Sequence, residues 1–380
     1  MTFQSVIGQT ELKRQLMQAA REGRMAHAQL FWGGEGCGAL ALALALAQYI
    51  HCPDRTEGDA CGVCPACNKM QKLIHPDLHF VAPVNSTKEI TADKKPVTEH
   101  FLAQWREALS ANPYLTEQEW YKTLGIENKQ GNISVQEASQ IIEKLNYKPF
   151  EAEYKIMIIW LPERMNQQAA NRLLKLIEEP PDKTLFFLVS EDITRIIATI
   201  RSRTQPVRVP PIEEEILAKK LQEQCALPEA HASKLARAAA GSYSEALRLV
   251  QSEQEADEHF DRFTTLMRLA YAVDGLALMH WAEEAALWGR EQQKSFLIYT
   301  ERLIRESFML NRQAGDVVYL LGEEETFAKK FSPYVNERNM EGIYNALNTA
   351  IAHLAQNGNA KILFTDLAMQ MISLIHKGKT

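Results

Sequence analysis

Four cysteines near the start of the chain have spacings that suit the binding of a metal ion. They are Cys52, Cys61, Cys64 and Cys67, and two residues separate each neighbouring pair among the last three. Two-residue gaps let neighbouring thiolates converge on one ion, and a structural Zn²⁺ takes four such ligands in a tetrahedron. Because four thiolates leave no open position for water, we predict a structural zinc site. A redox-active CxxC pair and a set of free thiols are the alternatives.

The remaining metal-ligand types form no second cluster along the sequence. Cys37 and Cys225 stand apart from the four cysteines, and we expect them to behave as small apolar residues. His75 and His79 flank a Pro-Asp-Leu segment, and we expect turn and strand positions for them rather than metal ligation.

The stretch GGEGCGAL, residues 33 to 40, has the glycine spacing of a phosphate-binding loop and follows an apolar run. In the form G-x-x-x-x-G-K-[ST], the lysine reaches the β and γ phosphates and the hydroxyl residue holds Mg²⁺. Here Ala39 stands at the lysine position and Leu40 at the hydroxyl position. A tight turn that needs glycine for positive φ is the alternative interpretation. The glycines concerned are Gly33, Gly36 and Gly38.

The end of a second apolar run, residues 155 to 160, is the place where a nucleotide site would carry acidic residues. Such residues hold Mg²⁺ and orient the attacking water. Trp160 and Leu161 occupy these positions instead, before Pro162 and Glu163. We therefore predict a degenerate nucleotide site, and we expect the isolated protein to bind ATP–Mg²⁺ negligibly.

These residues need a parallel sheet to position them, and the pattern of the first 209 residues predicts one. Short apolar runs at 30–32, 78–81, 155–160 and 185–189 alternate with helical patterns at 39–50, 134–145 and 168–179. This alternation predicts an α/β domain over residues 1–209, with the four-cysteine module at 50–70.

Residues 83–131 interrupt that alternation and have the pattern of a small helical insertion. Thr116-x-x-Glu119, within the insertion, and Ser134-x-x-Glu137, just after it, are candidate capping boxes. The insertion is either a docking surface or a tolerated surface excursion, and we expect the second. Beyond Val209-Pro210-Pro211 the pattern is helical only, which predicts a small bundle at 210–254 and a larger one at 255–380.

Composition limits the classes of function that fit this chain of 380 residues. Hydrophobic residues make up 46% and charged residues 24%, as in ordinary globular proteins. A net charge of −6 argues against a surface that coats nucleic acid. The start has no secretory signal pattern, and the apolar run at 39–47 is far shorter than the roughly 20 residues that span a bilayer. We expect a cytoplasmic protein without membrane contact, whose cysteines form no disulfides.

Taken together, several motifs resemble those of the bacterial clamp-loader AAA+ subunits of DNA polymerase III. The resemblance covers residues 3–81 and 133–254, is weak in the C-terminal bundle and is absent from the insertion. It implies an AAA+ α/β domain with a phosphate-loop-like turn, an all-α lid at 210–254 and an all-α collar at 255–380. The motifs are Ile7-Gly8-Gln9, Ala26-His27-Ala28, the glycine loop with the cysteine module after it, NRLLKLIEEPP at 171–181, and Ser202-Arg203-Thr204, where the family has Ser-Arg-Cys.

Within this family the chain looks like the delta prime type rather than the ATPase type, gamma/tau. The losses at 39, 40, 160 and 161 point this way, as does Ser244, where ATPase relatives carry a sensor arginine. The resemblance implies a non-catalytic subunit that helps load the sliding clamp in DNA replication. Its implied partners are gamma/tau-like ATPase subunits, a delta-like subunit and, through the complex, the sliding clamp and primer-template DNA. Arg203 is then implied to be an arginine finger that acts in trans at the neighbour's ATP site.

Two other classes of function remain as alternatives. An active gamma/tau-type ATPase with an unusual loop conflicts with five positions at once. A zinc-ribbon nucleic-acid-binding protein conflicts with the net charge and with the lack of a stripe that combines basic and aromatic residues.

Overall fold

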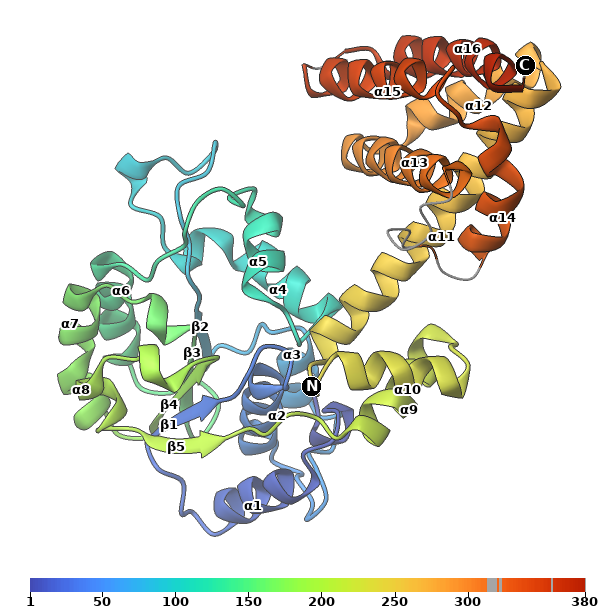
Figure 1. The fold of residues 1–380 in the computed structure, drawn as a ribbon. Helices are drawn as coiled ribbons and strands as arrows, with labels where there is room; N and C mark the ends of the chain where they lie inside the picture. Colours follow the sequence, from blue (N-terminus) through green and yellow to red (C-terminus); the bar gives the residue numbers. More distant parts are fainter. Residues whose placement is uncertain (313–319, 321–322, 357, 380) are drawn as a thin grey trace. The chain divides into compact units, whose positions relative to one another are not determined.

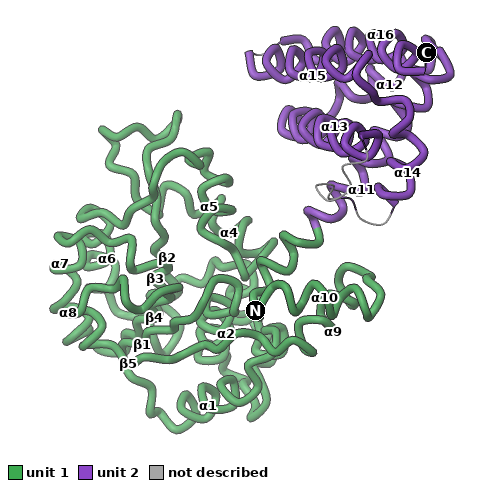
Figure 2. The backbone as a smooth tube through the Cα atoms, in the orientation of Figure 1, with its two compact units in different colours: residues 1–250 green, residues 251–380 purple. Residues whose placement is uncertain are grey.

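A computed structural model of the protein describes residues 1–312, 320, 323–356 and 358–379. The chain divides into two compact units, Met1–Val250 and Gln251–Thr380, which Figure 2 shows in different colours. The boundary falls inside one long helix, α11 (Tyr243–Ala272). Each unit has its own hydrophobic core, so each is described separately below.

Among the described residues of the first unit, five strands form one parallel sheet in the order β2-β3-β4-β1-β5 (Figure 1). Every residue of β3 and β4 is buried, because helices cover both faces of the sheet. This arrangement confirms the predicted AAA+ type of α/β fold. The strands are β1 (Ala28–Trp32), β2 (Leu78–Val81), β3 (Lys155–Trp160), β4 (Thr184–Ser190) and β5 (Gln205–Arg208).

Alternate residues of the strands feed two separate cores on the two faces of the sheet. Leu30 and Ile159 pack with helices α6 (Val135–Leu145) and α7 (Gln167–Glu178). Phe31 and Ile158 pack on the other face with α2. The remaining helices of this unit are α1 (Thr10–Arg21), α2 (Ala39–His51), α3 (Pro65–Gln71), α4 (Leu102–Ala111), α5 (Glu117–Leu124), α8 (Ala198–Arg201), α9 (Glu214–Cys225) and α10 (Glu229–Ala238).

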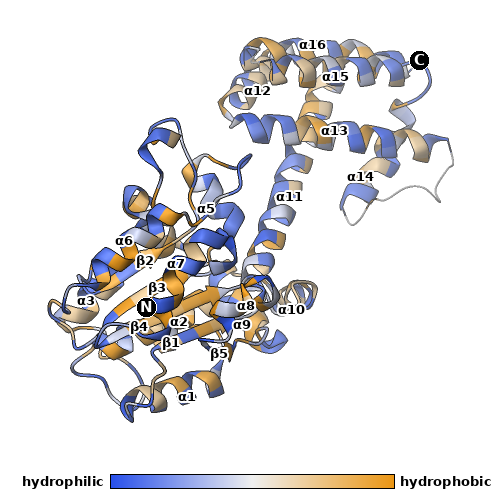
Figure 3. Ribbon diagram, turned by 90° about the vertical axis from the view of Figure 1, so that its left-hand side faces the viewer, coloured by the Kyte–Doolittle hydropathy of each residue, from blue (hydrophilic) through white to orange (hydrophobic). Residues whose placement is uncertain are grey.

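Helix α2 follows the glycine loop directly and is buried on all sides. All of its residues are buried, and Figure 3 shows its alanines and leucines in the hydrophobic colours. The alternation of Ala and Leu resembles that of a strand, but both residues are strong helix formers, and the predicted helix is confirmed. The buried helix fixes the position of the loop at its N-terminus.

The insertion packs into the first unit and is not the surface excursion that we expected. Trp105 of α4 and Trp120 of α5 are fully buried. Trp120 Nε1 donates a hydrogen bond to the Pro83 carbonyl at 2.8 Å. Arg164, just after β3, forms a two-pronged ion pair with Glu117 of α5. The expectation fails because the apolar stripe of α4 and α5 buries itself against the sheet domain instead of lying in solvent.

One of the two candidate capping boxes is complete and the other is only half formed. Thr116 and Glu119 exchange both hydrogen bonds at the start of α5. Ser134 accepts a bond from the Glu137 amide, but the Glu137 carboxylate accepts from the amide of Thr98 at 2.6 Å instead of returning to Ser134. Glu137 therefore joins α6 to the insertion.

The second unit is helical in every element of its described part. Leu303 and Leu347 lie at the centre of its core. In the described residues of the whole chain, none of the helices is both long and apolar enough to cross a membrane. Apart from α11, the α-helices of this unit are α12 (Gly275–Leu287), α13 (Arg290–Asn311), α14 (Glu323–Phe331), α15 (Met340–Ala355) and α16 (Ala360–Lys379).

Candidate functional site

The glycine loop joins the end of β1 to the start of α2, in the strand–loop–helix context of a phosphate-binding loop. Gly36 and Gly38 have φ values of 73° and 95°, which are left-handed conformations that favour glycine. Gly38 is also the N-cap of α2, so the loop presents the start of a helix as a phosphate site does. The backbone of a nucleotide site is therefore present.

Atoms from other segments of the chain lie close against the glycines of the loop. A Cβ atom on Gly33 would lie 2.3 Å from the Val209 carbonyl oxygen. A Cβ atom on Gly36 would lie 2.3 Å from Ser242 Oγ. Such contacts are too short for any side chain, so these glycines are needed for packing whether or not a ligand binds.

The cavity that remains above the loop is too small for a nucleotide. Its volume is about 30 Å³, which is room for about two water molecules. Pro113, Tyr114 and Leu115 of the insertion line it, opposite Ala39 and Leu40. The insertion therefore forms one wall of the narrow space over the loop.

Carboxylates make the surroundings of this cavity electrostatically unsuitable for phosphate. Burial raises the pKa of Glu191 to about 7, and the nearby charges of Glu35 and Glu163 contribute to the shift. Burial also raises the pKa values of Glu35 and Glu163. The Glu191 amide donates a hydrogen bond to Glu163 Oε1 at 3.1 Å. These acids would repel a triphosphate through a low-dielectric medium.

The end of β3 is apolar where a nucleotide site would hold metal. Trp160 is 2% exposed, and its ring centroid lies 5.2 Å from that of Trp105 in α4. Trp105 in turn lies 5.0 Å from Trp120 of α5. Leu161 is buried beside Trp160. Trp160 and Leu161, where the sequence predicted that acidic metal ligands are missing, thus belong to the same hydrophobic core as the insertion.

Arg203 lies after α8, well removed in sequence from the loop, and is partly exposed. Its Nε donates to Glu178 Oε2 at 2.7 Å, and its Nη1 donates to the Thr199 carbonyl at 3.1 Å. Glu178 belongs to the NRLLKLIEEPP segment, so the two family-like motifs meet in one ion pair. The Arg203 side chain is one-third exposed in this pair. The guanidinium is therefore held at the surface of the first unit.

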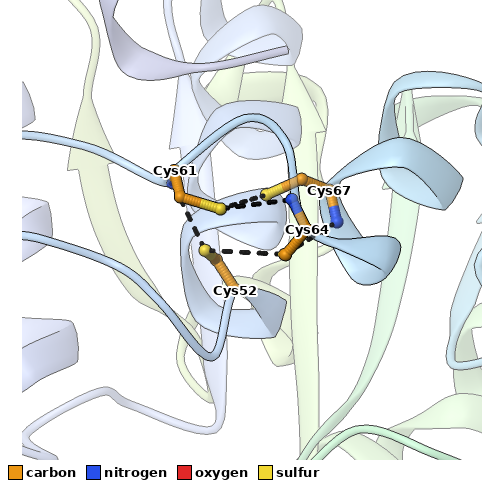
Figure 4. Close-up of side chains that lie close together, drawn as sticks. All are labelled: Cys52, Cys61, Cys64 and Cys67. Carbon is orange, nitrogen blue, oxygen red and sulfur yellow. Dashed lines mark hydrogen bonds between the residues drawn. The ribbon is translucent and has the colours of Figure 1, made fainter.

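The four cysteines meet between the end of α2 and the start of α3, as Figure 4 shows. Their sulfur atoms all lie within 4.8 Å of one another, and the Cys52–Cys64 and Cys61–Cys67 sulfurs are 4.0 Å apart. A tetrahedral ion with Zn–S bonds of about 2.3 Å places its sulfurs a little under 4 Å apart, so the cluster fits zinc.

Backbone amides support the thiolate form of the cluster. The amides of Cys61, Cys64 and Cys67 donate to the sulfurs of Cys52, Cys61 and Cys64 at 3.3 to 3.4 Å. Hydrogen bonds from the backbone lower the pKa of Cys61 to about 7, whereas burial raises the pKa values of Cys52 and Cys67. A bound zinc ion would supply a fixed cross-link between the two helices. Outside this quartet, the described residues contain no group of three or more His, Cys, Asp or Glu arranged to hold a metal ion.

Tyr114 is the residue of this region that sequence reasoning missed. It is 5% exposed and lies directly over the loop, where its ring would contact any side chain on Gly38. Its phenol accepts a hydrogen bond from the Ile7 amide, 107 residues away in sequence. Local pattern carries no information about a contact at that separation.

A family model described as "DNA polymerase III, delta subunit" matches residues 8–213. The subunit delta' of Escherichia coli K12 is 26% identical over 302 residues, which cover 80% of this chain and 75% of that protein. Subunit delta' of Bacillus subtilis 168 is 27% identical over 251 residues, covering 66% of this chain and 61% of that protein.

Matches to other subunits span smaller shares of those proteins. Subunit tau of Escherichia coli K12 is 25% identical over 255 residues, covering 65% of this chain and 32% of that protein. A solved structure of a DNA polymerase III gamma subunit-related protein from Thermotoga maritima is 18% identical, with a TM-score of 0.35, and covers 95% of this chain and 99% of that chain.

Proposed function

The chain belongs to the DNA polymerase III delta subunit family, whose model matches more than half of its length, and from this premise we propose that it is a non-catalytic, delta prime-type subunit of the clamp loader. In this role it assembles with gamma/tau-like ATPase subunits and a delta-like subunit. Through that complex it acts on the sliding clamp and primer-template DNA during replication.

The observation that carries this proposal is the filled nucleotide site. A cavity of about 30 Å³ over the glycine loop cannot accept a triphosphate, and the loop has no lysine or hydroxyl residue to hold one. Trp160 and Leu161 supply no ligand for Mg²⁺. A chain with this site contributes to ATP-driven loading through contacts with its neighbours and not through its own turnover of ATP.

Arg203 is the residue through which the subunit acts on a neighbour. Its side chain is partly exposed and keeps Nη2 outside its bonds to Glu178 and Thr199. A guanidinium that reaches the γ phosphate offsets the charge that develops there in the transition state. In the isolated chain Glu178 holds Arg203, and we infer that a bound ATP on the neighbouring subunit replaces Glu178 as its anionic partner.

The second unit provides surface for assembly with the other subunits. Leu276, Leu287 and Ile362 are large apolar side chains that remain mostly exposed on its helices. Exposed apolar side chains of this size are available for contacts with other subunits. We therefore assign the collar role to residues 255–380 and the lid role to residues 210–254.

The decisive experiment compares Arg203→Ala with wild type in a loader reconstituted with its ATPase and delta-like subunits. We expect single-turnover hydrolysis at the neighbouring site to slow by about 10³-fold, the lower end for an arginine finger. Arg203→Lys should recover little of this rate, because lysine keeps the charge but loses the planar fork. Arg201→Ala, a nearby exposed arginine, is the control. An unchanged rate for Arg203→Ala would remove the finger from the mechanism.

Measurements on the purified chain alone test the alternatives. An active gamma/tau-type ATPase would bind ATP–Mg²⁺ at micromolar concentration in equilibrium dialysis and hydrolyse it. A zinc-ribbon nucleic-acid-binding protein would retain DNA without the other subunits. We expect neither result, and either one would overturn the proposed role.

A further inference from the structure

Tyr114 joins four segments of the first unit that are far apart in the sequence. Its hydroxyl accepts a hydrogen bond from the Ile7 amide at 2.7 Å. Its ring lies against Gly38 of the glycine loop and packs edge-on against Tyr243, with ring centroids 4.9 Å apart. Its backbone carbonyl accepts a hydrogen bond from Ser244 Oγ at 2.6 Å.

Tyr243 and Ser244, at the start of α11, connect Tyr114 to the helices that follow the sheet domain. The Tyr243 amide donates to the Gly36 carbonyl at 3.0 Å, so the start of α11 is bonded to the loop itself. The Tyr243 hydroxyl contacts Gln224 near the end of α9. Residues 210–250 are thus attached to both the loop and the insertion through one small region.

Ser244 has a short side chain, and the geometry requires one. Its Oγ would lie 3.1 Å from a Cβ atom on Gly36, and its amide would lie 2.8 Å from the same atom. The hydroxyl reaches Tyr114, which stands where a nucleotide would stand over the loop. A longer side chain at this position would have to displace either Tyr114 or the loop.

We propose that Tyr114 is a built-in occupant of the nucleotide position and that it holds the helical segment 210–250 on the sheet domain in one arrangement, independently of ATP. Its contacts lie with the loop, with the segment before α1 and with the segment after the sheet. The insertion supplies them permanently from within the chain.

Hydrogen–deuterium exchange of the isolated full-length chain tests the proposal. In wild type, amide exchange in α9 and α10 should be the same with and without ATP–Mg²⁺. In Tyr114→Ala the same amides should exchange about tenfold faster, because the variant loses a buried ring and the hydrogen bond to Ile7. Amides of α7, on the other face of the sheet, serve as the internal reference and should not change.

Two milder variants keep the test valid if Tyr114→Ala fails to fold. Ser244→Ala removes the bond to the Tyr114 carbonyl, and Tyr114→Phe removes only the bond to Ile7. We expect both to increase exchange in α9, with Ser244→Ala showing the larger effect. Tyr147→Ala, an exposed tyrosine outside these contacts, is the matched control and should behave as wild type.

The result that overturns the proposal is unchanged exchange in α9 and α10 across the Tyr114 and Ser244 variants. Slower exchange of wild type on addition of ATP–Mg²⁺ would overturn it too, since the site would then respond to nucleotide. Both exchange measurements use the isolated chain. A failure of Arg203 in the reconstituted loader would therefore leave this proposal standing, and the reverse also holds.

Discussion

Side chains pack closely around the glycine loop in the space over it. Trp160 packs against Trp105 of the insertion, and the Ser244 hydroxyl donates a hydrogen bond to the Tyr114 carbonyl. The partly buried carboxyl groups near the loop lower the free energy of unfolding at neutral and higher pH, because burial disfavours their charged form. Glu191 is the clearest case, because its folded-state pKa of about 7 lies well above that of an exposed glutamate.

We predict that Glu191→Gln stabilises the protein at pH 8 and has little effect at pH 5. A raised folded-state pKa means that folding is opposed once the unfolded-state carboxyl ionises, so the penalty grows between about pH 4.5 and 7 and is complete above that range. The expected gain at pH 8 is about 3 kcal/mol. Thermal unfolding at the two pH values measures it, with exposed Glu179→Gln as the control. An equal effect at both pH values would show that Glu191 is not held neutral by its surroundings.

At the scale of elements, the four-cysteine module ties the start of the chain to helices α2 and α3. Asp59, within the module, accepts hydrogen bonds from the amides of Phe3 and Gln4 at 3.1 and 2.8 Å. The segment before α1 is therefore fixed by the same loop that carries the cysteines. Loss of the cross-link would release it.

We predict that the purified protein holds stoichiometric zinc and that Cys67→Ser loses it. Removal of the metal should lower the stability of the first unit by at least about 3 kcal/mol, because metal binding free energy is gained only in the folded state. Elemental analysis and thermal unfolding before and after treatment with a strong chelator measure both effects. Cys225→Ser should retain the metal, since Cys225 lies outside the quartet. Metal-free protein of undiminished stability would refute a structural role.

Most elements of the sheet domain could be predicted from the sequence, because their apolar periodicity is strong. The strand at Leu78–Val81 agrees residue by residue, and α2 begins at the predicted Ala39. Strand β5 was missed, because Pro206 weakens its pattern and its residues are largely exposed. Contacts between distant segments were not predictable at all, so the insertion was misjudged and Tyr114 was not noticed.

At the scale of the whole molecule, the chain contains two units with separate hydrophobic cores. The cores of the first unit contain residues up to Val250, and the core of the second begins at Phe263. Two independent cores favour two cooperative unfolding events rather than one.

We predict that calorimetry resolves two unfolding transitions and that a core substitution shifts one of them. Ile159→Ala should lower the free energy of unfolding of the first unit by about 2–5 kcal/mol, and its transition should move to lower temperature. Leu303→Ala should have the same effect on the second unit. Both side chains are completely buried, which makes them a matched pair. A single transition that both substitutions shift equally would mean that the two units unfold together.

The insertion's place over the glycine loop has a consequence for the history of such a chain. A return to nucleotide use would require Ala39→Lys, Trp160→Asp and a longer residue at Ser244. Ala39→Lys would add a cation beside Glu35 and Glu191, Trp160→Asp would bury a carboxylate among apolar side chains, and a longer side chain at position 244 would collide with Tyr114 while the insertion remains in place. Substitutions in the loop and in β3 alone would therefore not open a nucleotide site, because the insertion would also have to move.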